Sequence, residues 1–109
     1  MAATGFGGGV GRMGDICGAL SGGVMAVGLK HGRQSREDKD GVPNTYTLAE
    51  KLYGKFEGEF GSATCYQLLK VNLRNDEERK KWVEEGGPKF CGDLVKKTAR
   101  LVKEVLDED

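Results

Sequence analysis

The stretch "GFGGGVGRMGDICGALSGG", residues 5–23, holds nine glycines and a single cysteine, Cys17. Its Gly9, Gly11 and Gly14 have the spacing GxGxxG, which binds a dinucleotide only when a strand precedes it and a helix follows in a βαβ unit. Nothing before Gly9 can be a strand, and the GK[ST] of a Walker loop is missing from this stretch. The stretch therefore excludes the phosphate-binding α/β folds and leaves a helical one.

Apolar residues recur at helical spacing over most of the remaining chain. The expected helices occupy 15–31, 47–60, a short stretch after 61, 75–85 and 88–107. The residues expected to cap or begin them are Asp15, Thr47, Ser62, Asn75 and Pro88. No segment alternates with the period of two that a strand requires. We expect an all-α fold in a single domain over 1–109, a small bundle of about four to five helices with a Gly-rich N-terminal segment.

The charge of the chain argues against nucleic-acid partners. Its 17 basic and 17 acidic side chains cancel to a net charge of zero, so no strong field is available to attract a polyanion. Residues 33–45 are polar, contain Gly41 and Pro43, and mix both signs of charge. This composition predicts an exposed loop rather than a nucleic-acid-binding arm.

Membrane insertion and secretion are not expected either. The longest weakly polar segment, residues 16–29, is shorter than the roughly 20 apolar residues of a membrane span. Asp15 precedes this segment, and no small-x-small cleavage site follows it. The three widely spaced cysteines include no CxxC pair, which argues against a secreted disulfide scaffold. We expect a cytoplasmic protein.

The cysteines are the candidate reactive groups. Cys17, Cys65 and Cys91 each fall near the start of an expected helix. A helix N-terminus carries about half a positive charge, which favours the thiolate and lowers its pKa below the free value of about 8.5. We predict all three as catalytic residues, with Cys17 the most activated. In the alternative interpretation, each cysteine is only a small buried side chain.

A row of small residues accompanies Cys17. Gly14, Gly18 and Gly22 lie four residues apart, and Ala26 continues the row. Because a glycine inside a helix costs about 1 kcal/mol relative to alanine, the row needs a packing reason. We expect the row to let another backbone approach closely, and we take the three glycines as the candidate cofactor-binding positions.

Two residue types that occur once receive structural interpretations. His31 is expected to cap the end of its helix rather than bind a metal. It lies roughly 20 Å from Cys17 along that helix, too far for a Cys–His nucleophilic pair. Trp82 is expected to anchor its helix on the bundle rather than form a ligand platform.

The cysteine-containing segments resemble the C_GCAxxG_C_C family. The segments "GFGGGVGRMGDICGALSGGVMAVGLKHG", "FGSATCYQLL" and "FCGDLVKKTARLV" are similar to three blocks of that family, in the same order and over nearly the whole chain. The resemblance implies a small cytoplasmic helical protein, described as redox-active because of four cysteines and of neighbouring transporter or oxidoreductase genes. Cys17, Cys65 and Cys91 match the second, third and fourth of those cysteines.

The first cysteine of the family has no counterpart in this sequence. In the family it lies on a helix upstream of the glycine block, so the chain resembles a truncated member. The resemblance then implies an apolar groove where that helix would lie. A partner subunit could fill such a groove, and we expect a homo-oligomer.

Three hypotheses for the function remain open. In the first, the protein is a thiol-based redox or electron-transfer accessory protein, with Cys65 or Cys91 resolving Cys17 and a redox protein as candidate partner. In the second, the three thiolates bind a metal ion or an iron–sulfur cluster. In the third, the protein is a non-catalytic helical oligomer whose cysteines only pack.

Overall fold

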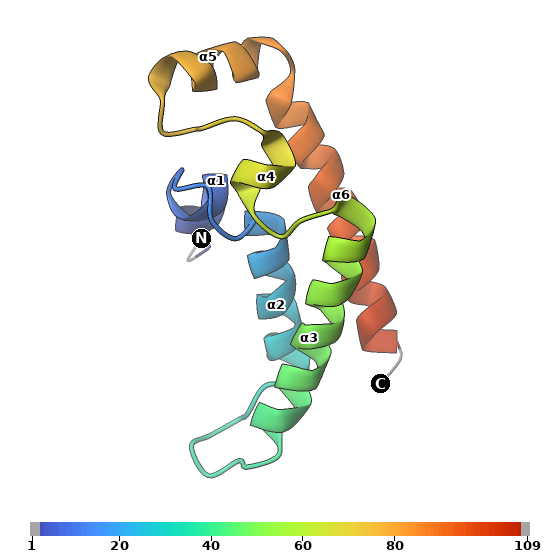
Figure 1. The fold of residues 1–109 in the computed structure, drawn as a ribbon. Coiled ribbons are helices and arrows are strands. Elements are labelled where there is room, and N and C mark those ends of the chain that lie inside the picture. The colour runs from blue at the N-terminus through green and yellow to red at the C-terminus, as the bar shows by residue number, and fades with distance from the viewer. Residues whose placement is uncertain (1–2, 108–109) are drawn as a thin grey trace.

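The computed structural model describes residues 3–107, and this part of the chain is all-α (Figure 1). Its elements are the 3-10 turn η1 (Thr4–Phe6) and the helices α1 (Gly7–Val10), α2 (Gly18–His31), α3 (Gly41–Phe60), α4 (Cys65–Leu69), α5 (Asp76–Glu84) and α6 (Gly87–Asp107). Within residues 3–107, β-pairing is limited to one isolated bridge between Ile16 and Thr64. The predicted fold class is confirmed.

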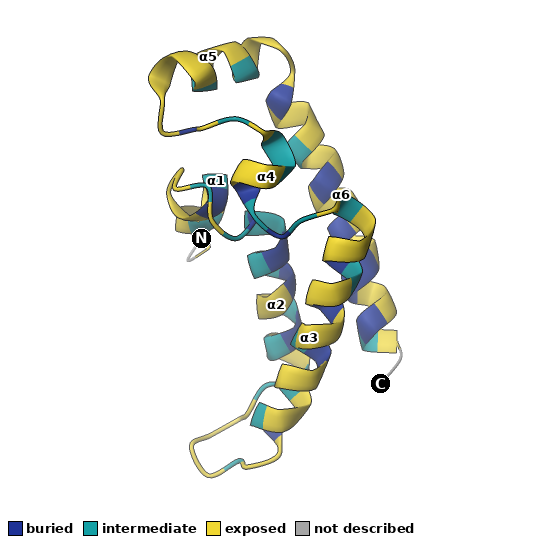
Figure 2. Ribbon diagram, in the orientation of Figure 1, coloured by how far each residue is buried: buried dark blue, intermediate teal, exposed yellow. Residues whose placement is uncertain are grey.

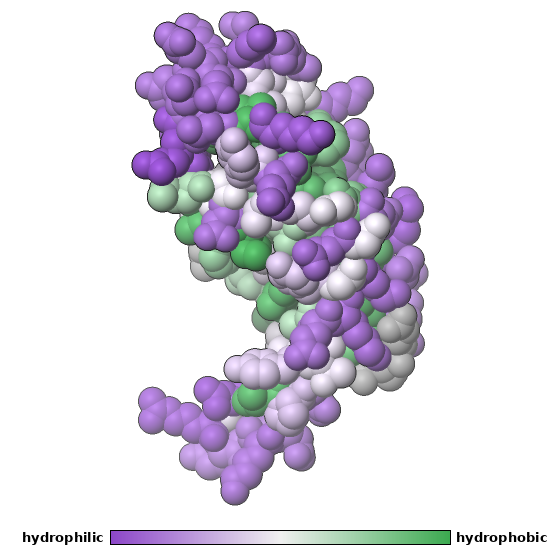
Figure 3. All heavy atoms as spheres, in the orientation of Figure 1, coloured by the Kyte–Doolittle hydropathy of each residue, from purple (hydrophilic) through white to green (hydrophobic). Residues whose placement is uncertain are grey.

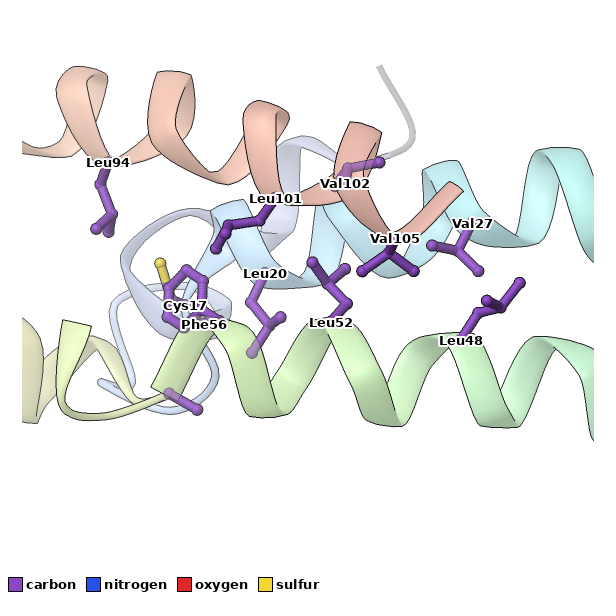
Figure 4. Packing of buried hydrophobic residues seen from close by; sticks show 11 residues of the cluster. Cys17, Leu20, Val27, Leu48, Leu52, Phe56, Leu94, Leu101, Val102 and Val105 are labelled. Atoms are coloured by element: carbon purple, nitrogen blue, oxygen red, sulfur yellow. The ribbon is translucent and has the colours of Figure 1, made fainter. Parts of the chain in front are cut away.

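The three long helices α2, α3 and α6 pack lengthwise and form what we call the stem (Figure 1). Large apolar side chains from all three helices point toward one another in its core (Figure 4). The buried members are Leu20, Val27, Leu48, Leu52, Phe56, Leu94, Leu101, Val102 and Val105. The expected four-residue spacing of Leu48, Leu52 and Phe56 on one helix face is confirmed.

The short elements η1, α1, α4 and α5, with the segments that join them, form what we call the head, at one end of the stem (Figure 1). The protein is elongated, with extents of 48 × 26 × 19 Å. Buried residues lie mainly on the inner faces of the stem helices, whereas α5 is largely exposed (Figure 2). No helix in residues 3–107 is both long and apolar enough to cross a bilayer.

The loop expected over 33–45 ends earlier than predicted, because α3 begins at Gly41. The Asp38 carboxylate accepts the N–H groups of Asp40 and Gly41 at 3.1 Å and so holds the start of the helix. Pro43 lies in the first turn of α3, where its missing N–H leaves no intrahelical bond unmade. Thr47, the expected N-cap, therefore lies inside α3.

The expected start of α2 at Asp15 is also wrong. Cys17 is the N-cap, and α2 begins at Gly18, because the residues before it pair in extended conformation with the segment around Thr64. The expected end is confirmed, since the Gly32 N–H donates to the Gly28 carbonyl.

The caps of the later helices follow the prediction in part. Thr64 rather than Ser62 caps α4, and the Ser62 hydroxyl instead accepts the Thr64 N–H at 3.1 Å. Asn75 caps α5 as predicted, because its side chain accepts the Glu78 N–H at 3.0 Å. Pro88 is the second residue of α6 rather than the first.

Candidate thiol site

A short antiparallel backbone pairing holds Cys17 and Cys65 together. The Cys17 N–H donates to the Ala63 carbonyl at 2.8 Å, and the Cys65 N–H donates to the Asp15 carbonyl at 2.7 Å. Side chains alternate between faces along paired extended segments, so the two cysteines lie on the same face as diagonal partners. Such partners are about 7–8 Å apart, close to the Cα separation of about 7 Å that still permits a disulfide.

Gly9 makes this pairing possible. Its φ is +70°, and a Cβ at this position would lie 2.6 Å from the Asp15 backbone nitrogen and 2.7 Å from the Cys65 Cβ. The Asp15 N–H also donates to the Gly9 carbonyl at 2.9 Å. The glycine-rich segment therefore supports the cysteines from behind through its backbone, in a conformation that a residue with a side chain adopts only with strain.

Cys91 reaches the same region from α6. It is half-buried, whereas Cys17 and Cys65 are each 7% exposed. The turn before α6 is tight, because a Cβ on Gly87 would overlap the indole ring of Trp82. This close approach fixes Trp82 of α5 against the first turn of α6, and Trp82 and Cys91 line the same cavity.

All three cysteines line one cavity of about 620 Å³. Phe6 and Trp82 contribute aromatic walls, and the rest of the lining is mainly glycine, alanine and branched apolar side chains. No acidic, basic or histidine side chain among the described residues belongs to the lining. Hydrophobic residues gather over the middle of the face shown in Figure 3, between hydrophilic residues at the α5 end and in the loop before α3. The thiols thus share a nearly uncharged environment.

The pKa of two thiols shifts in the direction opposite to the prediction. Burial, and to a lesser extent negative charge on Cys17 and Cys91, raise the pKa of Cys65 to about 11. Burial, and then charge on Cys17, also raises the pKa of Cys91. The helix-terminus effect is weak here because α4 has only five residues and Cys91 is the fifth residue of α6, beyond the unpaired N–H groups.

The three glycines predicted to bind a cofactor have three different surroundings. Gly14 precedes α2 with φ +76°, and a Cβ there would lie 3.1 Å from the Tyr66 Cβ. A Cβ on Gly18 would lie 2.9 Å from the Phe6 carbonyl oxygen, while Gly22 faces open space. Gly18 and Gly22 line the cavity and Gly14 does not. The expected single stripe is wrong because the helix starts only at Gly18.

Gly23 makes the close helix contact instead. A Cβ on Gly23 would lie 2.9 Å from Leu52 Cδ2 and 3.0 Å from Val102 Cγ2. Gly23 therefore allows α2 to approach both α3 and α6. Gly22 and Gly23 are adjacent in the sequence but point in different directions from α2, so Gly22 faces open space while Gly23 packs closely.

Metal ligands do not converge at the cysteines. No three His, Cys, Asp or Glu side chains in residues 3–107 are grouped so that they could hold a metal ion. His31 is the last residue of the 14-residue α2, about 20 Å along the helix from Cys17 at 1.5 Å per residue. The donor set therefore does not fit a metal ion or an iron–sulfur cluster.

The residues of α6 that line the cavity were not predicted as site residues from the sequence. Val95, Thr98, Ala99 and Val102 all line the cavity. Their spacing of three and four residues is the available signal, since it places them on one side of a helix. Val95 is 54% exposed although it is apolar, as expected for a residue that faces an open cavity.

Residues 1–105 match the family described as "Putative redox-active protein (C_GCAxxG_C_C)". The chain belongs to the C_GCAxxG_C_C family. No curated protein and no solved structure matches the sequence. Membership in the C_GCAxxG_C_C family confirms the resemblance drawn from the three cysteine-containing segments, and it supports a redox role in general terms.

Proposed function

We propose that this C_GCAxxG_C_C protein is a thiol-based redox protein in which Cys17 and Cys65 interconvert between a dithiol and a disulfide. The observation that carries the proposal is the convergence of three cysteines, from the starts of α2, α4 and α6, on one cavity. On oxidation two S–H bonds break and one S–S bond forms. Two protons and two electrons leave, and an external two-electron acceptor takes the electrons.

The backbone pairing favours Cys17 and Cys65 as the reacting pair. Their amide groups are tied to each other's segment by bonds of 2.8 and 2.7 Å, so the two residues are held on neighbouring segments. We assign Cys17 as the attacking thiol and Cys65, whose pKa burial raises, as the thiol with which it pairs. Cys91 is the third thiol of the cavity and stays reduced in this proposal.

A redox titration with thiol counting tests this function. The protein is equilibrated in dithiothreitol buffers of increasing potential and alkylated, and its free thiols are counted by mass spectrometry. We expect two thiols to disappear together in one two-electron transition, which Cys65→Ser abolishes and Cys91→Ser leaves in place. Three free thiols at every potential would refute the proposal and favour cysteines that only pack.

The location and the assembly of the protein are part of the same proposal. We infer a cytoplasmic location, because three free cysteines suit a reducing compartment, and a redox protein as the partner that renews the dithiol. Self-association is supported by Met25 and Leu29 on α2, which are 43% and 86% exposed. Sedimentation velocity of the wild type and of Leu29→Gln tests self-association, and identical monomeric profiles would contradict it.

A further inference from the structure

We propose that the cavity beside the three cysteines binds an uncharged, flat, mostly apolar two-electron carrier such as a quinone, which oxidises the cysteine pair. This inference rests on the proposed thiol chemistry and adds the class of its reaction partner. It stands on the lining of the cavity, on its size and on the position of the thiols within it.

The side chains that line the cavity favour an uncharged ligand. No charged side chain of the described residues contributes to the cavity wall. One of its hydroxyl groups, that of Thr98, is already engaged, since it donates to the Leu94 carbonyl at 2.7 Å. A carboxylate or ammonium group would lose part of its hydration here without gaining a charged partner, which is unfavourable. Charged peptide disulfides and other ionic oxidants are therefore poor ligands for this cavity.

The size and the walls favour an aromatic or quinoid ring. A volume of about 620 Å³ is within the range of small-molecule sites, which are about 300–1,000 Å³. Phe6 of the head and Trp82 of α5 supply aromatic surface against which a flat ring can stack. A Cβ on Gly22 would meet nothing within 4 Å, so this part of the α2 wall is free of side chains and a flat ring can lie against the helix.

The reaction balances without an ion in the cavity. The Cys17 and Cys65 S–H bonds break and an S–S bond forms, while the two quinone carbonyl oxygens each gain a proton and become hydroxyl groups. The electron pair released by the two thiols reduces the quinone to the hydroquinone. Because burial keeps the Cys65 thiol protonated at neutral pH, a carrier that takes protons together with electrons suits this site.

Trp82 provides a built-in binding probe because it is the only tryptophan in the chain and lines the cavity. The probe ligand is duroquinone, whose fully substituted ring has no hydrogen that a thiol could replace by addition. Binding is separated from reaction in the Cys17→Ser/Cys65→Ser/Cys91→Ser variant. We expect saturable quenching of Trp82 fluorescence by duroquinone in this variant.

Two substitutions to leucine, made in a Cys-to-Ser background and in the wild type, test the location. A side chain at Gly22 enters open space in the cavity, whereas one at Gly54 enters open space on the exposed face of α3, outside the cavity. We expect Gly22→Leu to weaken duroquinone binding at least tenfold and Gly54→Leu to leave it unchanged. Ala99→Leu, on the α6 wall, should reproduce the effect if Gly22→Leu fails to fold.

The oxidation itself is followed in the wild type. We expect one duroquinone to be reduced for every two thiols lost, at a rate that saturates with duroquinone concentration and falls at least tenfold in Gly22→Leu. Glutathione disulfide, which is charged, should oxidise the protein more slowly and without saturation.

Three outcomes would overturn the inference. The first is equal quenching of Trp82 fluorescence by duroquinone in Gly22→Leu and Gly54→Leu. The second is duroquinone binding without thiol oxidation. The third is a dimer, detected by sedimentation, in which a second copy of the chain covers the cavity and excludes duroquinone. If dithiothreitol buffers still drive the two-thiol transition in these cases, the proposed function stands and only its quinone partner is wrong.

Discussion

The stem and the head are built by different means. In the stem, large side chains fill the interior, and Leu52, Phe56 and Val105 are 0% exposed. In the head, backbone hydrogen bonds and glycines with positive φ set the positions of the chain, and a cavity of about 620 Å³ remains between head and stem. Apolar burial stabilises a fold in proportion to area, whereas backbone pairing fixes geometry. The stem therefore supplies the stability, and the head places the thiols.

The largest effect should follow from removing stem packing. Phe56→Ala deletes a fully buried ring that stacks edge-on against Phe60 at 4.7 Å. We expect the free energy of unfolding to fall by about 3–5 kcal/mol, measured by urea denaturation. The matched control on the same helix is Tyr53→Ala, at a side chain 39% exposed, which should cost about 1 kcal/mol or less. Equal losses in the two variants would show that the stem core is not where the stability resides.

Alkaline pH should lower the free energy of unfolding, because the head holds the Cys65 thiol in its protonated form. The folded state keeps Cys65 protonated up to a pKa of about 11, whereas the unfolded chain ionises it near its ordinary 9.0. Between these values the unfolded state holds fewer protons, so stability is complete below about pH 9 and is lost as the pH rises through about 11. The loss is at most about 3 kcal/mol.

Urea denaturation in the presence of a reductant measures this pH dependence. Cys65→Ala should retain only the slope that the raised pKa of Cys91 contributes. A wild-type slope no steeper than that of Cys65→Ala would show that Cys65 is not held in its protonated form.

A substitution at Gly9 separates placement from packing in the head. Gly9→Ala places a Cβ against Asp15 and Cys65 at φ +70°, and we expect a cost of about 2–3 kcal/mol, of which about 1–2 is conformational. Gly11→Ala, at φ +56° with nothing within 4 Å of its Cβ position, should lose only the conformational part of this free energy. Alkylation of Cys65 should accelerate in Gly9→Ala and much less in Gly11→Ala. Equal rates would contradict the role of Gly9 in supporting the pairing.

The smallest effect concerns the outer wall of the head. Asn75→Ala removes the cap of α5, which carries Trp82, and we expect a loss of about 1 kcal/mol. Acrylamide quenching of Trp82 fluorescence should rise as α5 loosens. Asn44→Ala, at an exposed asparagine in the first turn of α3, is the control and should leave the quenching unchanged. Unchanged quenching in Asn75→Ala would mean that the contact with Gly87 alone holds the indole.

The same contrast explains which features could be predicted from the sequence. The stem follows from apolar spacing, since Leu48, Leu52 and Phe56 face the core as expected. Helix ends that depend on local capping, such as Asn75, were also predictable. These features depend on residues close in sequence, for which periodicity and capping are direct signals.

The head could not be predicted to the same depth because tertiary contacts determine it. The N-cap at Cys17 depends on pairing with Ala63, which is far away in the sequence. The raised pKa of Cys65 depends on burial by several elements rather than on its place in a helix. That Gly23 packs closely while Gly22 faces open space is likewise decided by the positions of α3 and α6. Sequence located the three cysteines near helix starts but could not show that they share one cavity.

Disulfide mapping of the oxidised wild-type protein tests the central claim most directly. The protein is oxidised at low concentration with one equivalent of a two-electron oxidant, its remaining thiols are blocked, and its peptides are identified by mass spectrometry without reduction. The pairing of Cys17 with Ala63 and of Cys65 with Asp15 predicts an intramolecular Cys17–Cys65 link as the main product, with Cys91 free. Three free thiols, or links formed only between molecules, would contradict the claim that the head holds these two cysteines as a redox pair.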